Sequence, residues 1–79
     1  MQIKIFTLKS GLEVIDDVRA IRIVSKDYNL LILKDYVPII GKVEGSVEIE
    51  YGDSTKKLDL VVAYYVCNNN IFNLMIEGE

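Results

Sequence analysis

The sequence of 79 residues contains no histidine, no tryptophan, one proline and a single cysteine, Cys67. Histidine is the commonest general acid or base and the commonest metal ligand, so its absence excludes Cys/His zinc sites, Ser-His-Asp hydrolases and Cys-His hydrolases. A single cysteine cannot form an internal disulfide, which is typical of a reducing compartment. We therefore expect a cytoplasmic protein whose function does not depend on histidine or metal chemistry.

Long apolar runs and basic tracts are also missing. The longest apolar run, residues 60–67, is far shorter than the roughly 20 residues that span a bilayer. Residues 1–6 alternate polar and apolar side chains instead of forming the unbroken apolar stretch of a signal peptide. The net charge is −3 and the isoelectric point is near 4.8, whereas nucleic-acid binding depends on clustered Lys and Arg. We expect neither direct membrane insertion nor binding to nucleic acid.

The residues that are abundant favour β-strands. Ile and Val supply 20 of the 79 residues, while alanine, the best helix former, occurs only twice. Polar and apolar side chains alternate in segments 2–5, 47–51 and 57–60, and every second residue from 58 to 62 and from 72 to 76 is apolar, as in half-buried strands. The spacing of Val14, Val18 and Ile21 would also suit a helix, but this segment lacks a helix cap and is rich in β-branched residues. Strands are therefore the favoured interpretation here too.

Turn residues separate these segments at short intervals. They occur at Ser10-Gly11, at 26–29, at 52–54 and at 68–70, where Gly, Asn, Asp and Ser favour tight turns. Pro38 lacks a backbone donor and belongs at an edge or a corner. The sequence therefore predicts an all-β protein in one domain, residues 1–79, folded as a small antiparallel β-sandwich of about eight to ten short strands in two sheets.

None of the candidate reactive residues has a sequence context that favours catalysis or metal binding. Cys67 has no histidine to activate it and ends an apolar run, so a structural cysteine is the favoured interpretation. Asp16 and Asp17 could in principle act as a carboxylate pair, but adjacent residues of a strand point to opposite faces. There is also no glycine-rich phosphate-binding fingerprint. We predict no catalytic, cofactor-binding or metal site, and a protein that binds rather than catalyses.

Tyrosine offers candidates for a binding surface, because it is enriched at protein interfaces. In the pair Tyr64-Tyr65, strand alternation sends one ring inward and the other outward. One of the two is therefore an interface candidate, and the sequence does not distinguish which.

The stretch from residue 31 to residue 76 resembles the N-terminal β-sandwich domain of the epsilon subunit of F-type ATP synthase. That family commonly reads Gly-Ile-Leu-Pro-Asn-His-Ala-Pro-Leu, followed a few residues later by Pro-Gly. Leu31-Ile32-Leu33-Lys34-Asp35-Tyr36-Val37-Pro38-Ile39 stands in that place at unchanged spacing, with Glu44-Gly45 at the Pro-Gly. The matching residues are Ile32, Leu33, Pro38 and Gly45.

The remainder of the chain is similar to the family in order and spacing. Residues 62–64 stand where Gly-Gly-Phe is usual, 69–70 fall on an Asn-rich turn, and 72–75 fall on the last strand. Residues 1–7 resemble the first strand, and 12–24 the next two. The chain departs from the family in lacking the loop's first proline and histidine, the Gly-Gly pair, and the usual C-terminal helical hairpin.

The resemblance implies a non-catalytic role in coupling the central stalk to the membrane rotor. The family's sandwich binds the gamma subunit and rests on the c-ring, which would place the protein peripherally at the inner face of the membrane. The loop of Lys34, Asp35, Tyr36, Val37 and Pro38, with Tyr36 at the histidine position, is then the expected contact surface, together with Tyr64 and Tyr65. The family's inhibitory work belongs to the missing hairpin and is not expected.

Two alternatives remain open. The first is a stand-alone β-sandwich that self-associates or binds another protein, because a mean hydropathy of +0.24 suggests apolar surface left outside a small core. The second is a small enzyme that uses carboxylates or Cys67, which is the least favoured interpretation.

Overall fold

A computed structural model describes residues 1–77 and shows an all-β protein. The described residues contain no helix, so none of them lies in a helix that could cross a membrane. The strands are β1 (Gln2–Thr7), β2 (Gly11–Ile15), β3 (Val18–Ser25), β4 (Asn29–Leu33), β5 (Ile39–Tyr51), β6 (Ser54–Asn68) and β7 (Ile71–Ile76). The all-β prediction is confirmed, and Val14, Val18 and Ile21 lie in strands rather than in a helix.

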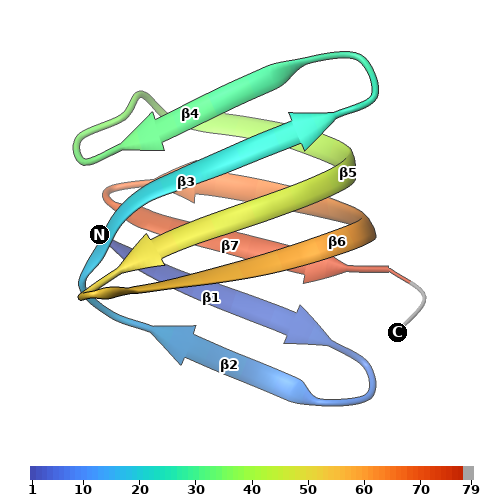
Figure 1. Ribbon diagram of the computed structural model, residues 1–79, viewed down its shortest axis with the longest axis horizontal. Coiled ribbons are helices and arrows are strands. Elements are labelled where there is room, and N and C mark those ends of the chain that lie inside the picture. The colour runs from blue at the N-terminus through green and yellow to red at the C-terminus, as the bar shows by residue number, and fades with distance from the viewer. Residues whose placement is uncertain (78–79) are drawn as a thin grey trace.

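The seven strands form one mixed sheet in the order β2-β1-β7-β6-β5-β3-β4 (Figure 1). Neighbouring strands are antiparallel except β1 and β7, which are parallel. The predicted turns all occur, and backbone φ is positive at Gly11, Gly52, Asn69 and Asn70. Pro38 lies, as expected, in the loop between β4 and β5.

The sheet differs from the prediction of two sheets with eight to ten strands because β5 and β6 are long and bent. Residues 39–45 of β5 pair with 61–67 of β6, and residues 47–51 pair with 54–58. Between these stretches β6 has one extra residue, a β-bulge at which Leu60 has a φ of 55°. Bulges bend strands and increase their twist. Each long strand therefore runs through two parts of one sheet where the sequence suggested separate strands.

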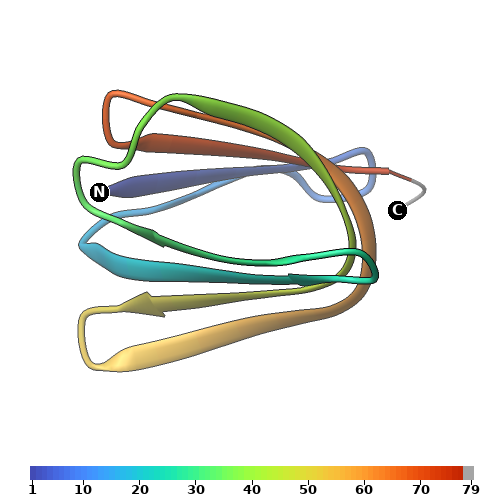
Figure 2. The ribbon, with the colours of Figure 1, turned by 90° about the horizontal axis from the view of Figure 1, so that it is seen from above.

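The bend folds the sheet over so that two halves face each other, as Figure 2 shows from above. We call one of them the β1 half; it consists of β2, β1, β7, residues 61–68 of β6 and residues 39–45 of β5. The other is the β3 half; it consists of β3, β4, residues 47–51 of β5 and residues 54–58 of β6.

The core lies between the two halves and takes side chains from both. Along each strand, alternate residues point inward, as Ile3 and Ile5 do from β1 and Ile21 and Ile23 do from β3. Each fully buried aliphatic side chain contributes about 1.5–3 kcal/mol to folding. The other buried core residues are Ile15, Val18, Ile32, Val43, Val47, Ile49, Val61, Ala63, Tyr65, Cys67, Phe72 and Leu74.

Candidate protein-binding surface

The loop from Lys34 to Pro38 is held against the turn between β6 and β7. The backbone N–H of Asp35 donates a hydrogen bond of 2.6 Å to the side-chain oxygen of Asn70. The Asn70 amide in turn donates one of 2.9 Å to the Asp35 carboxylate. Asp35 has a φ of 62°, a conformation that Asp tolerates better than most residues. These two bonds fix the loop that the sequence singled out.

The side chains of this loop divide into two groups. Lys34, Asp35, Val37 and Pro38 are exposed and available to a partner. Tyr36 is half-buried and packs against the core, so only part of its ring could contact another molecule.

Tyr64 and Tyr65 point to opposite sides of β6, and the structure decides which one is outside. Tyr65 is only 4% exposed and stacks on Phe72 with the ring centroids 5.4 Å apart. Tyr65 is therefore a core residue, which corrects its candidacy for direct partner contact. Tyr64 is exposed on the outer side of β6.

The Tyr65 hydroxyl is part of a short chain of hydrogen bonds. Tyr28 donates to the backbone carbonyl of Lys42, and the hydroxyls of Tyr28 and Tyr65 lie 2.9 Å apart. Since the Tyr28 proton is used on the carbonyl, Tyr65 donates to Tyr28. Burial, and then the hydrogen bond with Tyr28, raises the pKa of Tyr65. The ring is thus kept neutral and in place.

The outer side of the β1 half carries a row of apolar side chains that crosses four strands. Strand register places Leu12 beside Phe6, Phe6 beside Met75, and Met75 beside Tyr64. We call these four residues the apolar row; each is between 39% and 53% exposed. A second row of the same face runs through Val14, Lys4, Asn73, Val66 and Ile40. Lys4 and Asn73 interrupt the second row, whereas the apolar row is contiguous, and contiguous exposed apolar surface marks interaction sites.

A shallow hollow connects this face to the Lys34–Pro38 loop. It has a volume of about 410 Å³ and is lined by Pro38, Ile39, Ile40, Val66, Cys67 and Asn68. Ile40 belongs to the second row and follows the loop directly. The loop and the apolar face therefore form one continuous surface.

The outer side of the β3 half is more charged. Arg19 lies 3.9 Å from Glu50 and Arg22 lies 3.7 Å from Glu48, which links β3 to β5. The apolar side chains exposed on this side, Val24, Leu31 and Leu33, lie on β3 and on the edge strand β4. Exposed ion pairs of this sort contribute little to stability, but they keep a face hydrated.

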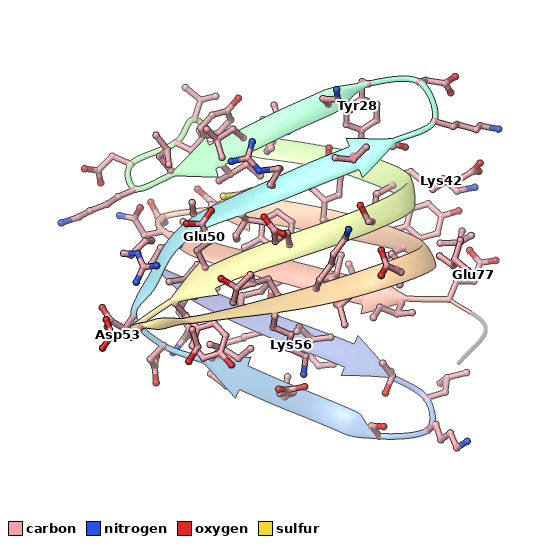
Figure 3. The ribbon with its side chains drawn as sticks, viewed as in Figure 1. Tyr28, Lys42, Glu50, Asp53, Lys56 and Glu77 are labelled. Atoms are coloured by element: carbon pink, nitrogen blue, oxygen red, sulfur yellow. The ribbon has the colours of Figure 1, made fainter. Side chains whose placement is uncertain are left out.

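One end of the apolar row meets a charge cluster. Lys42, the β5 neighbour of Tyr64, holds its ammonium 5.5 Å from the centre of the Tyr64 ring and 3.4 Å from Glu44. Glu44 also pairs with Lys26 at 2.9 Å. These hydrogen bonds lower the pKa of Glu44 and raise the pKa values of Lys26 and Lys42. Figure 3 shows Lys42 and Glu77 at the same side of the molecule.

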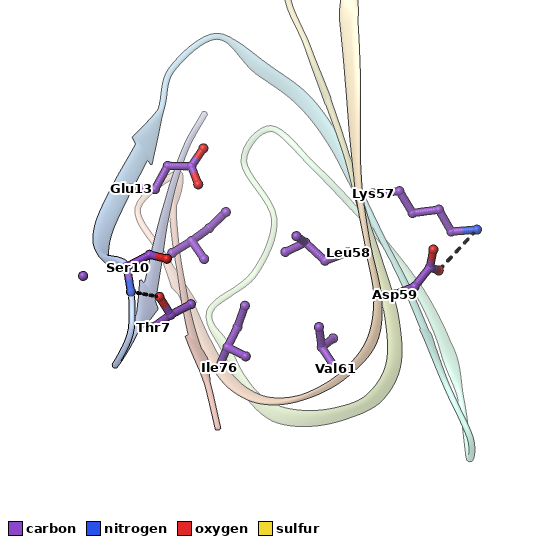
Figure 4. Close-up of a pocket in the computed structure, with 10 residues that line it drawn as sticks. Thr7, Ser10, Glu13, Lys57, Leu58, Asp59, Val61 and Ile76 are labelled. Atoms are coloured by element: carbon purple, nitrogen blue, oxygen red, sulfur yellow. Dashed lines mark hydrogen bonds and ion pairs between the residues drawn. The ribbon is translucent and has the colours of Figure 1, made fainter. Parts of the chain in front are cut away.

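A pocket of about 320 Å³ opens between the β1–β2 hairpin and β6 (Figure 4). Its apolar lining comes from Ile5, Leu58, Val61 and Ile76. Lys57 pairs with Asp59 at 3.6 Å on the side of β6 that faces away from the pocket (Figure 4). Across the opening, Lys56 of β6 bonds the Glu13 carboxylate of β2 at 3.0 Å, which links the β3 half to the β1 half. The ionisable groups here are thus engaged in ion pairs.

The candidate reactive residues have structural partners. Cys67 is buried, and burial raises the pKa of its thiol. Asp16 accepts a hydrogen bond of 2.7 Å from the Gln2 side chain, and the Asp17 carbonyl accepts one from Gly52. Within residues 1–77, no cluster of three or more Cys, Asp or Glu side chains could hold a metal ion.

No protein-family model matches the chain, and no curated protein matches it either. The apolar row was not predicted from the sequence, apart from Tyr64. Segment 12–14 gives the one sequence signal for this row. Glu13 is flanked by Leu12 and Val14, so the two apolar side chains lie on the face of the strand opposite the Glu13 side chain. Because Glu13 points toward the opening of the folded sheet, the two apolar residues face outward.

Proposed function

We propose that the protein is a non-catalytic protein-interaction domain that binds its partner through the outer face of the β1 half. The apolar row of Leu12, Phe6, Met75 and Tyr64 carries this proposal. Burying such side chains against a partner is favourable, and interface hot spots are enriched in tyrosine.

The resemblance to the epsilon subunit suggests who the partners are. In this proposal the folded sheet acts as a two-layered β-sandwich that couples the gamma subunit of a central stalk to the c-ring. The facing halves of the sheet support this assignment, as does the position of the Lys34–Pro38 loop beside the apolar face. The protein would then be held at the inner face of the membrane through the complex.

Co-purification with the gamma and c subunits of the same organism tests this role. Tyr64→Asp and Met75→Asp place a charge in the apolar row and should abolish capture. Leu31→Asp, at 41% exposure on the opposite outer face, is the matched control and should be captured as the unmodified protein is. A folded protein that captures neither subunit would rule out the stalk role.

A second candidate is a stand-alone domain that self-associates or binds another protein and has no part in ATP synthesis. The same exposed apolar row favours it, because this surface requires a partner whichever complex the protein belongs to. Light scattering separates the two: a stable oligomer of the isolated protein supports self-association, and a monomer opposes it.

A further inference from the structure

We propose that β4 is a binding site for an extended segment of a partner protein, which pairs with it as an additional, antiparallel strand. The segment carries apolar side chains beside Leu31 and Leu33, an acidic side chain beside Lys34 and a basic one beside Asp27. The site lies on the β3 half, away from the apolar row, so this inference goes beyond the proposed function and does not depend on it.

The hydrogen-bond pattern of the β3–β4 hairpin determines which backbone groups of β4 are available. The N–H of Ser25 donates to the C=O of Tyr28 at 2.8 Å, so these two residues form a hydrogen-bonded pair. Hydrogen-bonded and non-hydrogen-bonded pairs alternate along an antiparallel ladder. The register therefore turns the N–H and C=O groups of every second residue of β4 away from β3; these residues are Asn29, Leu31 and Leu33.

Within residues 1–77, no strand pairs with these groups. β4 is the last strand of the sheet and lies at its margin in Figure 1. None of the backbone hydrogen bonds of the turns and loops reaches Asn29, Leu31 or Leu33. An extended chain at the spacing of about 4.8 Å is the ligand whose donors and acceptors match such a row. The chemistry of the edge therefore selects a polypeptide in strand conformation.

Two other edges of the sheet carry features that oppose strand addition. On β2, the charged Glu13 side chain points toward the opening of the folded sheet and bonds Lys56. On the part of β6 that β7 does not cover, the bulge at Leu60 interrupts the strand. Inward-pointing charges and bulges are common protection of an edge against a further strand.

A third edge, that of β5 over residues 39–44, is blocked by the β3–β4 hairpin. The Lys42 carbonyl accepts a hydrogen bond from the Tyr28 hydroxyl, and the Glu44 N–H donates one to the Ser25 hydroxyl. β4 has no comparable protection, because its five residues, Asn-Leu-Leu-Ile-Leu, include no charge and no proline, and its pairing with β3 has no bulge. β4 is thus the edge that suits a partner strand.

The side chains along this edge suit an apolar strand. Leu31 and Leu33 are 41% and 49% exposed on the outer face of the β3 half. A residue opposite either of them in an added strand directs its side chain to the same face, within contact distance. Near the start of β4 this face has a hollow of about 280 Å³, lined by Arg22, Val24, Asn29, Leu30 and Leu31. The partner side chain opposite Asn29 packs into this hollow.

Exposed charges of opposite sign flank the edge. Asp27 lies in the turn before β4, and Lys34 follows its last residue. Within residues 1–77 neither forms an ion pair, whereas Lys26, next to Asp27, is paired with Glu44. An antiparallel partner begins beside Lys34 and ends beside Asp27. Charge complementarity therefore favours an acidic residue before its apolar segment and a basic residue after it.

A synthetic peptide tests the site. Acetyl-Glu-Val-Thr-Val-Thr-Val-Thr-Lys-amide places its valines opposite Leu33, Leu31 and Asn29 and its charges beside Lys34 and Asp27. We expect saturable binding to the full chain below about 1 mM, measured by nuclear magnetic resonance titration. The same peptide with N-methylated valines keeps every side chain and charge but lacks the N–H groups that face β4. It should bind at least about tenfold more weakly.

Equal binding of the two peptides overturns the proposal, as does the absence of binding by the first peptide up to about 1 mM.

Hydrogen exchange locates the bound peptide. The peptide should slow amide exchange at Asn29, Leu31 and Leu33 by about tenfold or more and leave β2 unchanged. Slowing on β2 alone places the peptide at the wrong edge and overturns the proposal. A free protein that sediments as a dimer, with these three amides already protected, has a second copy on the edge and also overturns it.

Substitution of Leu31 separates backbone pairing from side-chain contact. Leu31→Pro removes an N–H that points away from β3, so the β3–β4 ladder keeps its bonds, and it should weaken peptide binding by about tenfold or more. Leu31→Val keeps the N–H and an apolar side chain and should bind within about twofold of the unmodified protein. Circular dichroism confirms that both variants are folded. Unchanged affinity in folded Leu31→Pro overturns the proposal; if that variant does not fold, the N-methylated peptide decides.

Discussion

At the scale of single residues, Gly41 illustrates how the absence of a side chain positions a neighbour. A Cβ atom at this position would lie 2.9 Å from Cε2 of Tyr65 and closer still to its hydroxyl. Tyr65 is stacked on Phe72 and held through Tyr28, so it has little room to move. Gly41→Ala should therefore lower the free energy of unfolding by about 1–3 kcal/mol, the usual cost of overpacking a core.

Urea unfolding measures this loss, and Tyr65→Leu provides the matched background. Once the aromatic ring is gone, adding Gly41→Ala should cost less than it does in the unmodified protein. An equal cost in both backgrounds would show that Tyr65 is not the obstacle.

Leu60 is a second residue at which the local conformation affects stability, because its backbone adopts an unfavourable conformation. Its φ of 55° is unfavourable for leucine, and its side chain is 97% exposed, so no side-chain contact compensates for the backbone conformation. Asparagine tolerates this conformation much better. Leu60→Asn should raise the free energy of unfolding by up to about 1 kcal/mol, measured by urea unfolding. Val62→Asn, two residues along the same strand, is the control and should bring no gain.

At the scale of elements, Glu44 joins the β3–β4 turn to β5. Its carboxylate pairs with Lys26 of the turn and with Lys42 of its own strand. Because its pKa is lowered in the folded protein, its contribution to stability is complete above the unfolded-state value. That contribution is lost as the pH falls through the lower folded-state value. Glu44→Gln should therefore make the free energy of unfolding fall less steeply below about pH 4.5.

Urea titrations at pH 7 and in the range of about pH 3 to 5 test this dependence. Lys26→Met removes the cation that contributes most to the lowered pKa of Glu44. It should likewise make the free energy of unfolding fall less steeply at acid pH. If Glu44→Gln and the unmodified protein lose stability in parallel, the cluster does not link the turn to the strand.

At the scale of the whole molecule, Cys67 reports on opening of the folded sheet. The thiol lies in a core to which both halves contribute, and burial raises its pKa, so the reactive thiolate is scarce as well as shielded. A disulfide reagent should modify it at least about 100-fold more slowly than a free cysteine, with a rate that rises with urea. Complete modification in native buffer at the rate of an unfolded control would contradict the closed arrangement of the two halves.

Much of the strand pattern could be predicted because it depends on neighbours in the sequence. Alternation around Ile3 and Ile5, and the glycine and asparagine turns, follow from strand geometry and from the residues that accept positive φ. The bend at Leu60 could not be predicted in this way. Leucine is a poor residue for that conformation, and only pairing with both parts of β5 holds it there.

For the candidate surface, the sequence could say that Tyr64 and Tyr65 face opposite ways but not which one is buried. Gly41 decides that, since it lies opposite Tyr65 on β5 and leaves room for the ring. The apolar row could not be predicted from the sequence for a similar reason. Leu12, Phe6, Met75 and Tyr64 come from four strands, and only the pairing register brings them side by side.

The sequence by itself determined the all-β class, the positions of the turns and the absence of histidine chemistry. These properties belong to residue types and to short-range spacing. The tertiary structure alone decided that one sheet folds over on itself, that Tyr65 is buried, and that an apolar row crosses one outer face. Each of these depends on contacts between residues far apart in the chain, and a one-residue change of register would turn the same side chains to the opposite face.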